Sequence, residues 1–136
     1  MSSKPSITVS RLDLERIEAL LERMTPAQAE TYAPLVAELV RAEVVEPAQM
    51  PPNVVTMNSR VTFLDESDGE QLSLTLVYPT NAGATGTVSI LAPVGSALLG
   101  LAVGQQIAWP TPDGRSRTLK VLGIEYQPEA AGDLHR

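Results

Sequence analysis

Hydrophobic residues recur at helical spacing near the start of the chain. One stripe, at intervals of three, four and three residues, consists of Leu14, Ile17, Leu21 and Met24. Such a narrow stripe is typical of a coiled-coil seam and predicts a helix over residues 11–24. Ser10 is its expected N-cap, and Asp13 stands where a capping box has its acidic residue. Residues 7–9 (Ile-Thr-Val) indicate a short strand before this helix.

Two prolines divide the segment that follows. Proline is favoured at the first helical position, so Thr25, Pro26 and Gln28 are predicted to cap one further turn. Pro34 starts a second helix, because proline lacks the donor that a helix interior requires. Its two apolar stripes are Leu35, Leu39 and Ala42, and Val36, Val40 and Val44. The pattern predicts two antiparallel helices, each ~18–22 Å long, with a tip at residues 25–33. The alternative is a helix pair folded flat on the rest of the chain.

A proline-rich segment separates this helical part from the remainder. Prolines at positions 47, 51 and 52 exclude a continuous helix, so this segment is predicted to be extended and stiff. The predicted boundaries are 1–46 for a helical hairpin, 47–52 for the linker and 53–136 for a β-rich domain.

The hydrophobic period changes from helical to alternating after the prolines. Alternation predicts strands near residues 60–64, 72–78, 88–90, 107–109 and 118–126. A bulge is expected at Gly123, and turns are expected at Asp68-Gly69 and at residues 112–114. Residues 93–99 predict a short helix that stops at Gly100, which can adopt the left-handed conformation. The expected fold class is α+β, with a five- or six-stranded antiparallel sheet and one short helix following the helical hairpin.

The composition excludes several partners and activities. The chain has 136 residues, a net charge of −6 and no cysteine. Residues 1–46 and 47–136 each carry five basic and eight acidic side chains, so autonomous nucleic-acid binding is not expected. The single histidine, His135, is expected to be a solvated tail residue and not a base or a metal ligand.

Patterns for catalysis and for metal or cofactor binding are weak. The acidic cluster at residues 65–70 lacks the spacing of a calcium loop and is expected to be a solvated turn. Gly95, Gly100 and Gly104 are too far apart to cradle a phosphate. No apolar run approaches the ~20 residues of a membrane span, and no signal peptide is evident, so a cytoplasmic location is expected. No catalytic residue, metal or cofactor is predicted, and the chain is expected not to be an enzyme.

Five stretches of the second part resemble a known bacterial family. They are residues 54–61 (VVTMNSRV), 65–70 (DESDGE), 76–79 (LVYP), 92–104 (APVGSALLGLAVG) and 125–133 (EYQPEAAGD). Their order resembles the Rnk family, the regulators of nucleoside diphosphate kinase, within the wider Gre transcript-cleavage factor family. The pattern Pro-x-x-x-Ala-Leu-Leu-Gly-x-x-Val-Gly, which starts at Pro93, is specific to the wider family. The MNSR and YQPEAAGD stretches indicate the narrower one.

This resemblance implies an FKBP-like β domain preceded by a coiled-coil finger. Gre-type factors place the β domain at the rim of the RNA polymerase secondary channel, and acidic side chains at the finger tip help to hold a catalytic metal. In this chain Glu30 is the only carboxylate between Arg23 and Pro34. A hard cation requires several converging oxygens, so transcript cleavage is not carried over. Prolyl isomerase activity is not implied either, because fold does not determine function.

The same resemblance nominates partner-binding residues. The family's rim-contacting sequence Ser-Ile-Asp-Ser-Pro matches Ser-Ile-Leu-Ala-Pro at residues 89–93. Leu91 replaces the acidic residue, so docking would depend less on charge pairing; the alternative is that Leu91 is an ordinary strand residue. The predicted partner-binding residues are Ser89, Leu91 and Pro93 in this segment and Gln28 and Tyr32 at the tip.

Three functions follow as hypotheses. The leading one is a transcription regulator that binds bacterial RNA polymerase near the secondary channel. It would compete with Gre-type factors without cleaving transcripts and would regulate nucleoside diphosphate kinase indirectly. The alternatives are a divergent transcript-cleavage factor or isomerase, and a module that contacts nucleoside diphosphate kinase directly. A monomer is expected, because the proline breaks favour helix pairing within the chain. Neither a membrane nor a nucleic acid is an expected partner.

Overall fold

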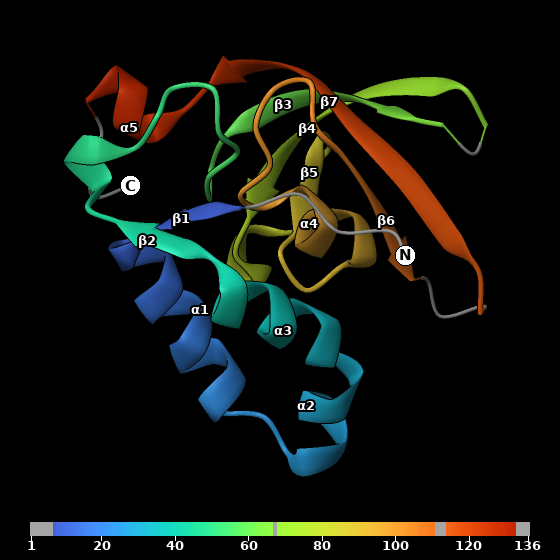
Figure 1. Ribbon diagram of the computed structural model, residues 1–136. Helices are drawn as coiled ribbons and strands as arrows, with labels where there is room; N and C mark the ends of the chain where they lie inside the picture. Colours follow the sequence, from blue (N-terminus) through green and yellow to red (C-terminus); the bar gives the residue numbers. More distant parts are fainter. Residues whose placement is uncertain (1–6, 67, 111–113, 133–136) are drawn as a thin grey trace.

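The chain forms a twisted sheet with a group of helices on one side (Figure 1). The structure is a computed structural model that describes residues 7–66, 68–110 and 114–132. Its helical segments are α1 (Arg11–Glu22), α2 (Pro26–Thr31), α3 (Ala33–Arg41), α4 (Pro93–Leu98), α5 (Pro128–Ala131) and the 3-10 turns η1 (Pro47–Gln49) and η2 (Pro79–Asn81). Its strands are β1 (Thr8–Ser10), β2 (Glu43–Val45), β3 (Arg60–Asp65), β4 (Glu70–Val77), β5 (Thr87–Ser89), β6 (Gln106–Pro110) and β7 (Ser116–Tyr126).

The N-terminal helices begin where the capping residues and prolines predict. The Asp13 N–H donates to Ser10 Oγ at 3.1 Å, which caps α1. Thr25 and Gln28 form a reciprocal capping box on α2, with Pro26 in its first turn. Such caps stabilise a helix by about 1 kcal/mol, because they satisfy N–H groups that have no partner within the helix. The predicted N-terminal helix and the cap at residues 25–28 are confirmed.

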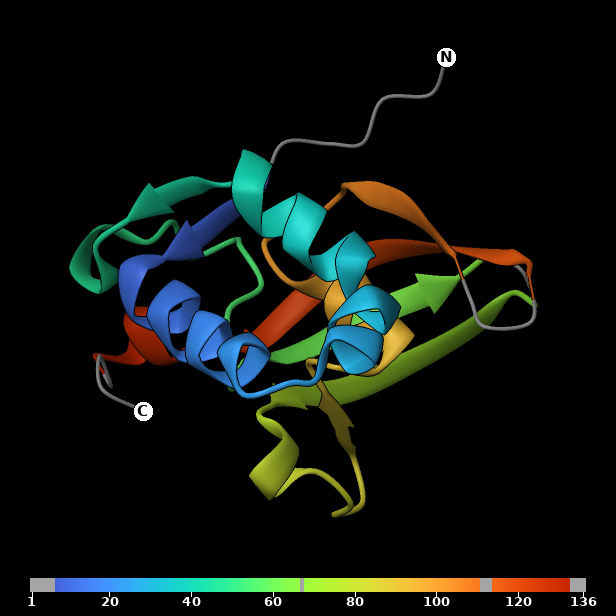
Figure 2. The same cartoon turned by 90° about the horizontal axis from the view of Figure 1, so that it is seen from below.

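The main sheet has the order β5-β4-β3-β7-β6 and is antiparallel except at one edge. There β5 runs parallel to β4, with Leu76 opposite Val88. The prediction of a wholly antiparallel sheet was therefore wrong. Pro79 opens η2 at the end of β4, so no tight hairpin forms. The chain instead loops out beyond the sheet edge and returns in the same direction, as Figure 2 shows.

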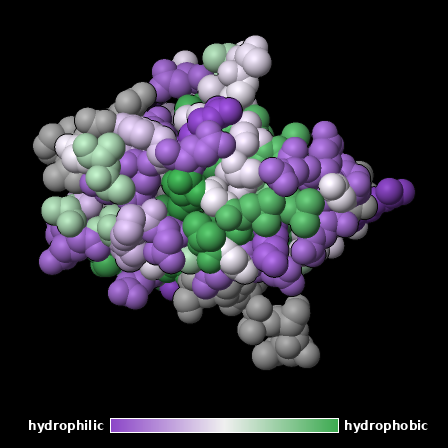
Figure 3. Space-filling view, turned by 90° about the horizontal axis from the view of Figure 1, so that it is seen from above, coloured by the Kyte–Doolittle hydropathy of each residue, from purple (hydrophilic) through white to green (hydrophobic). Residues whose placement is uncertain are grey.

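The strand β7 contains the predicted bulge. Thr62 of β3 is opposite Gly123, and Phe63 is opposite Val121, so Leu122 is the additional residue. A bulge of this kind bends its strand and increases the local twist. On the side of the molecule opposite α1 and α3, hydrophobic surface forms a strip among polar side chains (Figure 3).

A second, two-stranded ladder joins the two ends of the helical part. β1 and β2 are parallel, with Val9 opposite Val44. This confirms the short N-terminal strand, but it corrects the prediction that the second helix extends through Val44. The helix α3 ends at Arg41 because the backbone turns to extended geometry at Ala42 and pairs with β1.

The proline-rich segment is less extended than predicted. Pro47–Gln49 forms the 3-10 turn η1, and Met50 behind it is buried. Burial of a methionine side chain stabilises a fold by about 1.5–3 kcal/mol, which favours the turn over a fully extended path. The C-terminal helix α5 was not predicted from the sequence. Residues 111–113 of the second predicted turn and His135 lie outside the described residues.

One continuous hydrophobic core links the helices to the sheet. Ile17 of α1 and Leu35 and Leu39 of α3 belong to the same buried cluster as Phe63 of β3 and Leu98 of α4. Both α1 and α3 are therefore packed against the β-rich part and held at a defined angle to it. The tip, α2, contains no buried residue and forms the end of the helical part far from the sheet (Figure 1).

Candidate docking site

The segment from Ser89 to Pro93 is ordered by hydrogen bonds at the edge of the sheet. Ser89 Oγ accepts from the Leu91 N–H at 3.1 Å, and the Ser89 carbonyl accepts from the Ala92 N–H at 3.0 Å. Both bonds turn the chain sharply out of β5 and into α4, where Pro93 is in the first turn. The three residues predicted to bind a partner in this segment therefore lie within one compact turn.

Buried neighbours fix this turn from below. Ile90 is fully buried, and its N–H donates to the Val77 carbonyl at 2.9 Å. Ser96 Oγ donates to the Ile90 carbonyl at 2.6 Å. Gly95 lies so close to Ser89 that a Cβ atom there would be 2.0 Å from the Ser89 carbonyl oxygen. The segment is thus pre-organised, and binding a partner does not require it to be ordered first.

The three nominated side chains of this turn are half-buried. Leu91 packs part of its surface against the hydrophobic core and leaves the rest accessible. Ser89 and Pro93 flank it with similar exposure. The turn therefore presents a small, mainly apolar surface without a charged side chain of its own.

The two tip residues have different positions. Gln28 accepts from the Thr25 N–H at 3.0 Å, so its side chain is part of the capping box. Tyr32 is the junction between α2 and α3 and is half-buried. Both belong to the α2–α3 segment, whereas Ser89–Pro93 joins β5 to α4 (Figure 1), so the nominated residues come from two different segments of the chain.

No arrangement for metal binding occurs among residues 7–66, 68–110 and 114–132, where no three His, Cys, Asp or Glu side chains converge. The acidic turn predicted at residues 65–70 has a structural role. Asp65 is buried with its Oδ2 atom 2.9 Å from Arg117 Nη2, and Asp68 Oδ1 accepts from the Glu70 N–H. These carboxylates stabilise the β3–β4 turn.

A buried polar link between α1 and the β-rich part was missed at the sequence level. Asp13 Oδ2 accepts from the Met57 N–H at 3.1 Å, and Tyr78 Oη donates to Asp13 Oδ1 at 3.4 Å. The position of Asp13 predicted that its carboxylate would complete a capping box. The carboxylate instead binds Met57 and Tyr78. The pKa of Asp13 is raised to about 6, mainly by burial and to a smaller extent by the nearby Glu129, while the hydrogen bond from the Met57 N–H opposes the rise. Burial also raises the pKa of Tyr78.

Family comparisons match the two parts of the chain separately. Residues 5–45 match the model described as Rnk N-terminus, and residues 50–126 match the model described as Transcription elongation factor, GreA/GreB, C-term. A protein named Regulator of nucleoside diphosphate kinase from Escherichia coli strain K12 is 52% identical over 132 residues, which is 96% of this chain and 97% of that protein. The chain belongs to the Rnk family, within the GreA/GreB group.

Other relatives of this Rnk-family chain are named as GreA or GreA/GreB elongation factors. A GreA transcription elongation factor from Thermodesulfovibrio yellowstonii is 32% identical over 94 residues, covering 68% of this chain and 59% of that protein. A solved structure titled as a GreA/GreB elongation factor from Nitrosomonas europaea is 50% identical, with a TM-score of 0.69. It covers 90% of this chain and 100% of that one. The relatives are thus named as regulators and transcription factors. Among the described residues of this chain, no helix has the length and apolar character to cross a bilayer.

Proposed function

We propose that this Rnk-family protein is a non-enzymatic transcription regulator that binds RNA polymerase near the secondary channel and competes there with Gre-type factors. It acts as a cytoplasmic monomer and affects nucleoside diphosphate kinase indirectly, through transcription. Residues 53–136, with an FKBP-like arrangement, are the docking domain, and residues 47–52 connect it to the helical hairpin of residues 1–46. The GreA/GreB match over residues 50–126 supports the polymerase as partner.

One observation carries the proposal: a rigid docking turn is combined with a short helix pair whose tip has a single carboxylate. The helix α1 has 12 residues, which corresponds to ~18 Å. Glu30 is the one carboxylate between Arg23 and Pro34. Catalysis by a divalent ion requires converging oxygen ligands at the reaction centre, and one carboxylate on a short arm does not supply them. The function that remains is to occupy the polymerase near its secondary channel without cleaving the transcript.

The proposed contact uses Ser89, Leu91 and Pro93 on the polymerase and Gln28 and Tyr32 at the channel entrance. Leu91 contributes apolar surface where Gre-type factors carry an acidic residue. The free energy of such a contact arises from removing apolar surface from water, and it depends weakly on ionic strength. The turn needs no reorganisation, because Ser89 and Ser96 already hold it.

Replacing Leu91 with serine is expected to weaken binding to core RNA polymerase about fivefold, since an apolar contribution of about 1 kcal/mol is lost. The measurement is a titration of immobilised core polymerase with the wild-type and variant proteins, followed by displacement with a GreA-type factor. Leu122→Ser, at a residue that is 39% exposed on β7, is the control and should bind like the wild type.

Two results would remove the proposal. One is that the wild-type protein fails to bind the core polymerase. The other is that it binds but is not displaced by a GreA-type factor at any concentration, which would place it elsewhere on the enzyme. Equal weakening by Leu91→Ser and Leu122→Ser would refute the assignment of the docking turn.

A further inference from the structure

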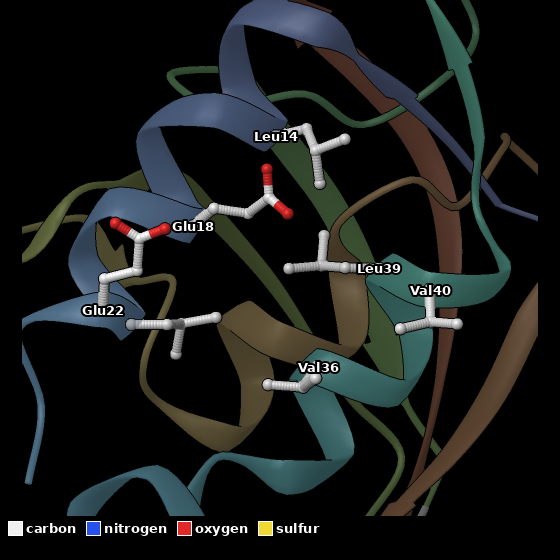
Figure 4. Close-up of a pocket in the computed structure, with 7 residues that line it drawn as sticks. Leu14, Glu18, Glu22, Val36, Leu39 and Val40 are labelled. Atoms are coloured by element: carbon white, nitrogen blue, oxygen red, sulfur yellow. The ribbon is translucent and has the colours of Figure 1, made fainter.

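An open apolar groove of about 340 Å³ lies between α1 and α3. Figure 4 shows side chains of the two helices facing one another across it. Its lining residues are Leu14, Glu18, Leu21, Glu22, Val36, Leu39 and Val40. The hydrophobic stripe of α1 predicts a closed seam, but Leu14 and Leu21 are only partly buried. The two helices therefore leave part of their apolar surface accessible.

Two valines of α3 are exposed beside the groove. Val40 is 80% exposed and Val36 is 39% exposed. They are four residues apart, so they lie on one face of α3, one turn from each other. The next valine of this stripe, Val44 in β2, is 36% exposed. β-branched side chains do not favour helix formation, and contiguous exposed apolar surface is typical of an interaction site.

The charge around the groove is negative. Glu18 and Glu22 line it from successive turns of α1, and none of its lining residues is basic. Like charges four residues apart on a helix are mutually unfavourable, and a cation placed between them relieves this repulsion. Among the arginines of the helical part, Arg11 is bound to Glu46 and Arg41 is bound to Glu38. The groove therefore combines apolar walls with an acidic edge.

We propose that this groove binds a cationic amphipathic helix of a partner protein. Apolar side chains at helical spacing would contact Val36, Val40 and Leu14, and a flanking Lys or Arg would pair with Glu18 and Glu22. The length of α1, 12 residues, accommodates about three turns of such a helix. A symmetric second copy is disfavoured, because it would bring the two acidic edges together. None of the groove's lining residues belongs to Ser89–Pro93, so the inference goes beyond polymerase docking and does not depend on it.

The probe for this proposal is a fluorescent 14-residue helical peptide with leucines on one face and lysines on the other. We expect saturable binding to the full chain, measured by fluorescence anisotropy at low salt. The double variant Glu18→Gln, Glu22→Gln should weaken binding about fivefold to tenfold and reduce its salt dependence. The double variant Val36→Ser, Val40→Ser should weaken it about tenfold with the salt dependence retained.

Matched controls separate this groove from the general negative charge of the chain. The double variant Glu66→Gln, Glu70→Gln removes two exposed carboxylates from the β3–β4 turn and should bind like the wild type. A peptide of the same composition in scrambled order should bind at least tenfold more weakly.

Several results would overturn the proposal. They are the absence of saturable peptide binding, equal binding of the scrambled peptide, and equal weakening by the variants at Glu18 and Glu22 and at Glu66 and Glu70. Concentration-dependent dimerisation that Val40→Ser abolishes would also overturn it, in favour of a second copy as the occupant.

Discussion

Alanine at Gly95 is expected to destabilise the protein by about 3 kcal/mol or more. A Cβ atom at this position would lie 2.0 Å from the Ser89 carbonyl oxygen and 3.1 Å from Leu76 Cδ1. The first contact is with backbone, so no side-chain rotation relieves it. The helix α4 must separate from β5, which breaks the packing of Leu98 and the turn at Ser89. Urea unfolding monitored by Trp109 fluorescence measures the loss.

The matched control is Gly123→Ala. Gly123 lies in the bulge of β7, and a Cβ atom there meets nothing within 4 Å. The unfolding free energy of the Gly123→Ala variant should stay within about 0.5 kcal/mol of the wild-type value. If Gly95→Ala proves as stable as Gly123→Ala, the close approach of α4 to β5 is not present in solution.

The largest pH effect is expected at Asp13. Its pKa in the folded chain is raised to about 6 by burial, whereas an unfolded aspartate has a pKa of about 3.9. Below about pH 4 the Asp13 carboxyl is protonated in both the folded and the unfolded chain, so its burial brings no charge out of water. As the pH rises through 6, the buried group must ionise, and the stability that it contributes is lost. The difference of about two pH units corresponds to ~3 kcal/mol.

Asn at position 13 removes this titration. Asp13→Asn keeps an oxygen that can accept from the Met57 N–H, and its amide has no charge to bury. We expect the unfolding free energy of the variant, minus that of the wild type, to rise by ~3 kcal/mol between pH 4 and pH 7. Chemical denaturation at a series of pH values measures this difference.

Glu15→Gln is the control for this pH series, since it removes an exposed carboxylate from the same helix. Its difference from the wild type should change by less than 1 kcal/mol over the same range. A flat difference for Asp13→Asn would contradict the buried position of Asp13 between Ser10, Met57 and Tyr78.

Local features of the fold were predictable from the sequence because they depend on near neighbours. Proline at positions 26 and 34 starts the two later helices, and Thr25 with Gln28 caps the first of them. Gly100, which has a φ of +82°, ends the α4 segment as predicted. These features require only the conformational preferences of single residues and contacts three or four positions apart.

Features that depend on distant contacts were not predictable. The parallel pairing of β5 follows from the path of the chain around the sheet edge, and the extended geometry at Val44 follows from its pairing with Val9. Asp13 is buried by contacts with residues 44 and 65 positions away. Predicting the groove between α1 and α3 requires knowledge of how far apart the two helices lie, and a hydrophobic stripe does not encode this distance.

The nominated docking residues could be predicted from the sequence only in part. Residues 89–93 were found through family resemblance, since Ser-Ile-Leu-Ala-Pro contains no distinctive chemistry by itself. Their rigidity depends on Gly95 and Ser96, which no local pattern connects with Ser89. Gln28 is the opposite case, because its role in the cap follows from its spacing to Thr25.

We infer that this Rnk-family protein occupies the polymerase without cleaving RNA. Stalled transcription complexes supplied with magnesium and this protein should release no short 3′ RNA fragments, and an excess of the protein should slow the cleavage driven by a GreA-type factor. Magnesium-dependent release of 3′ fragments by this protein alone would contradict the account.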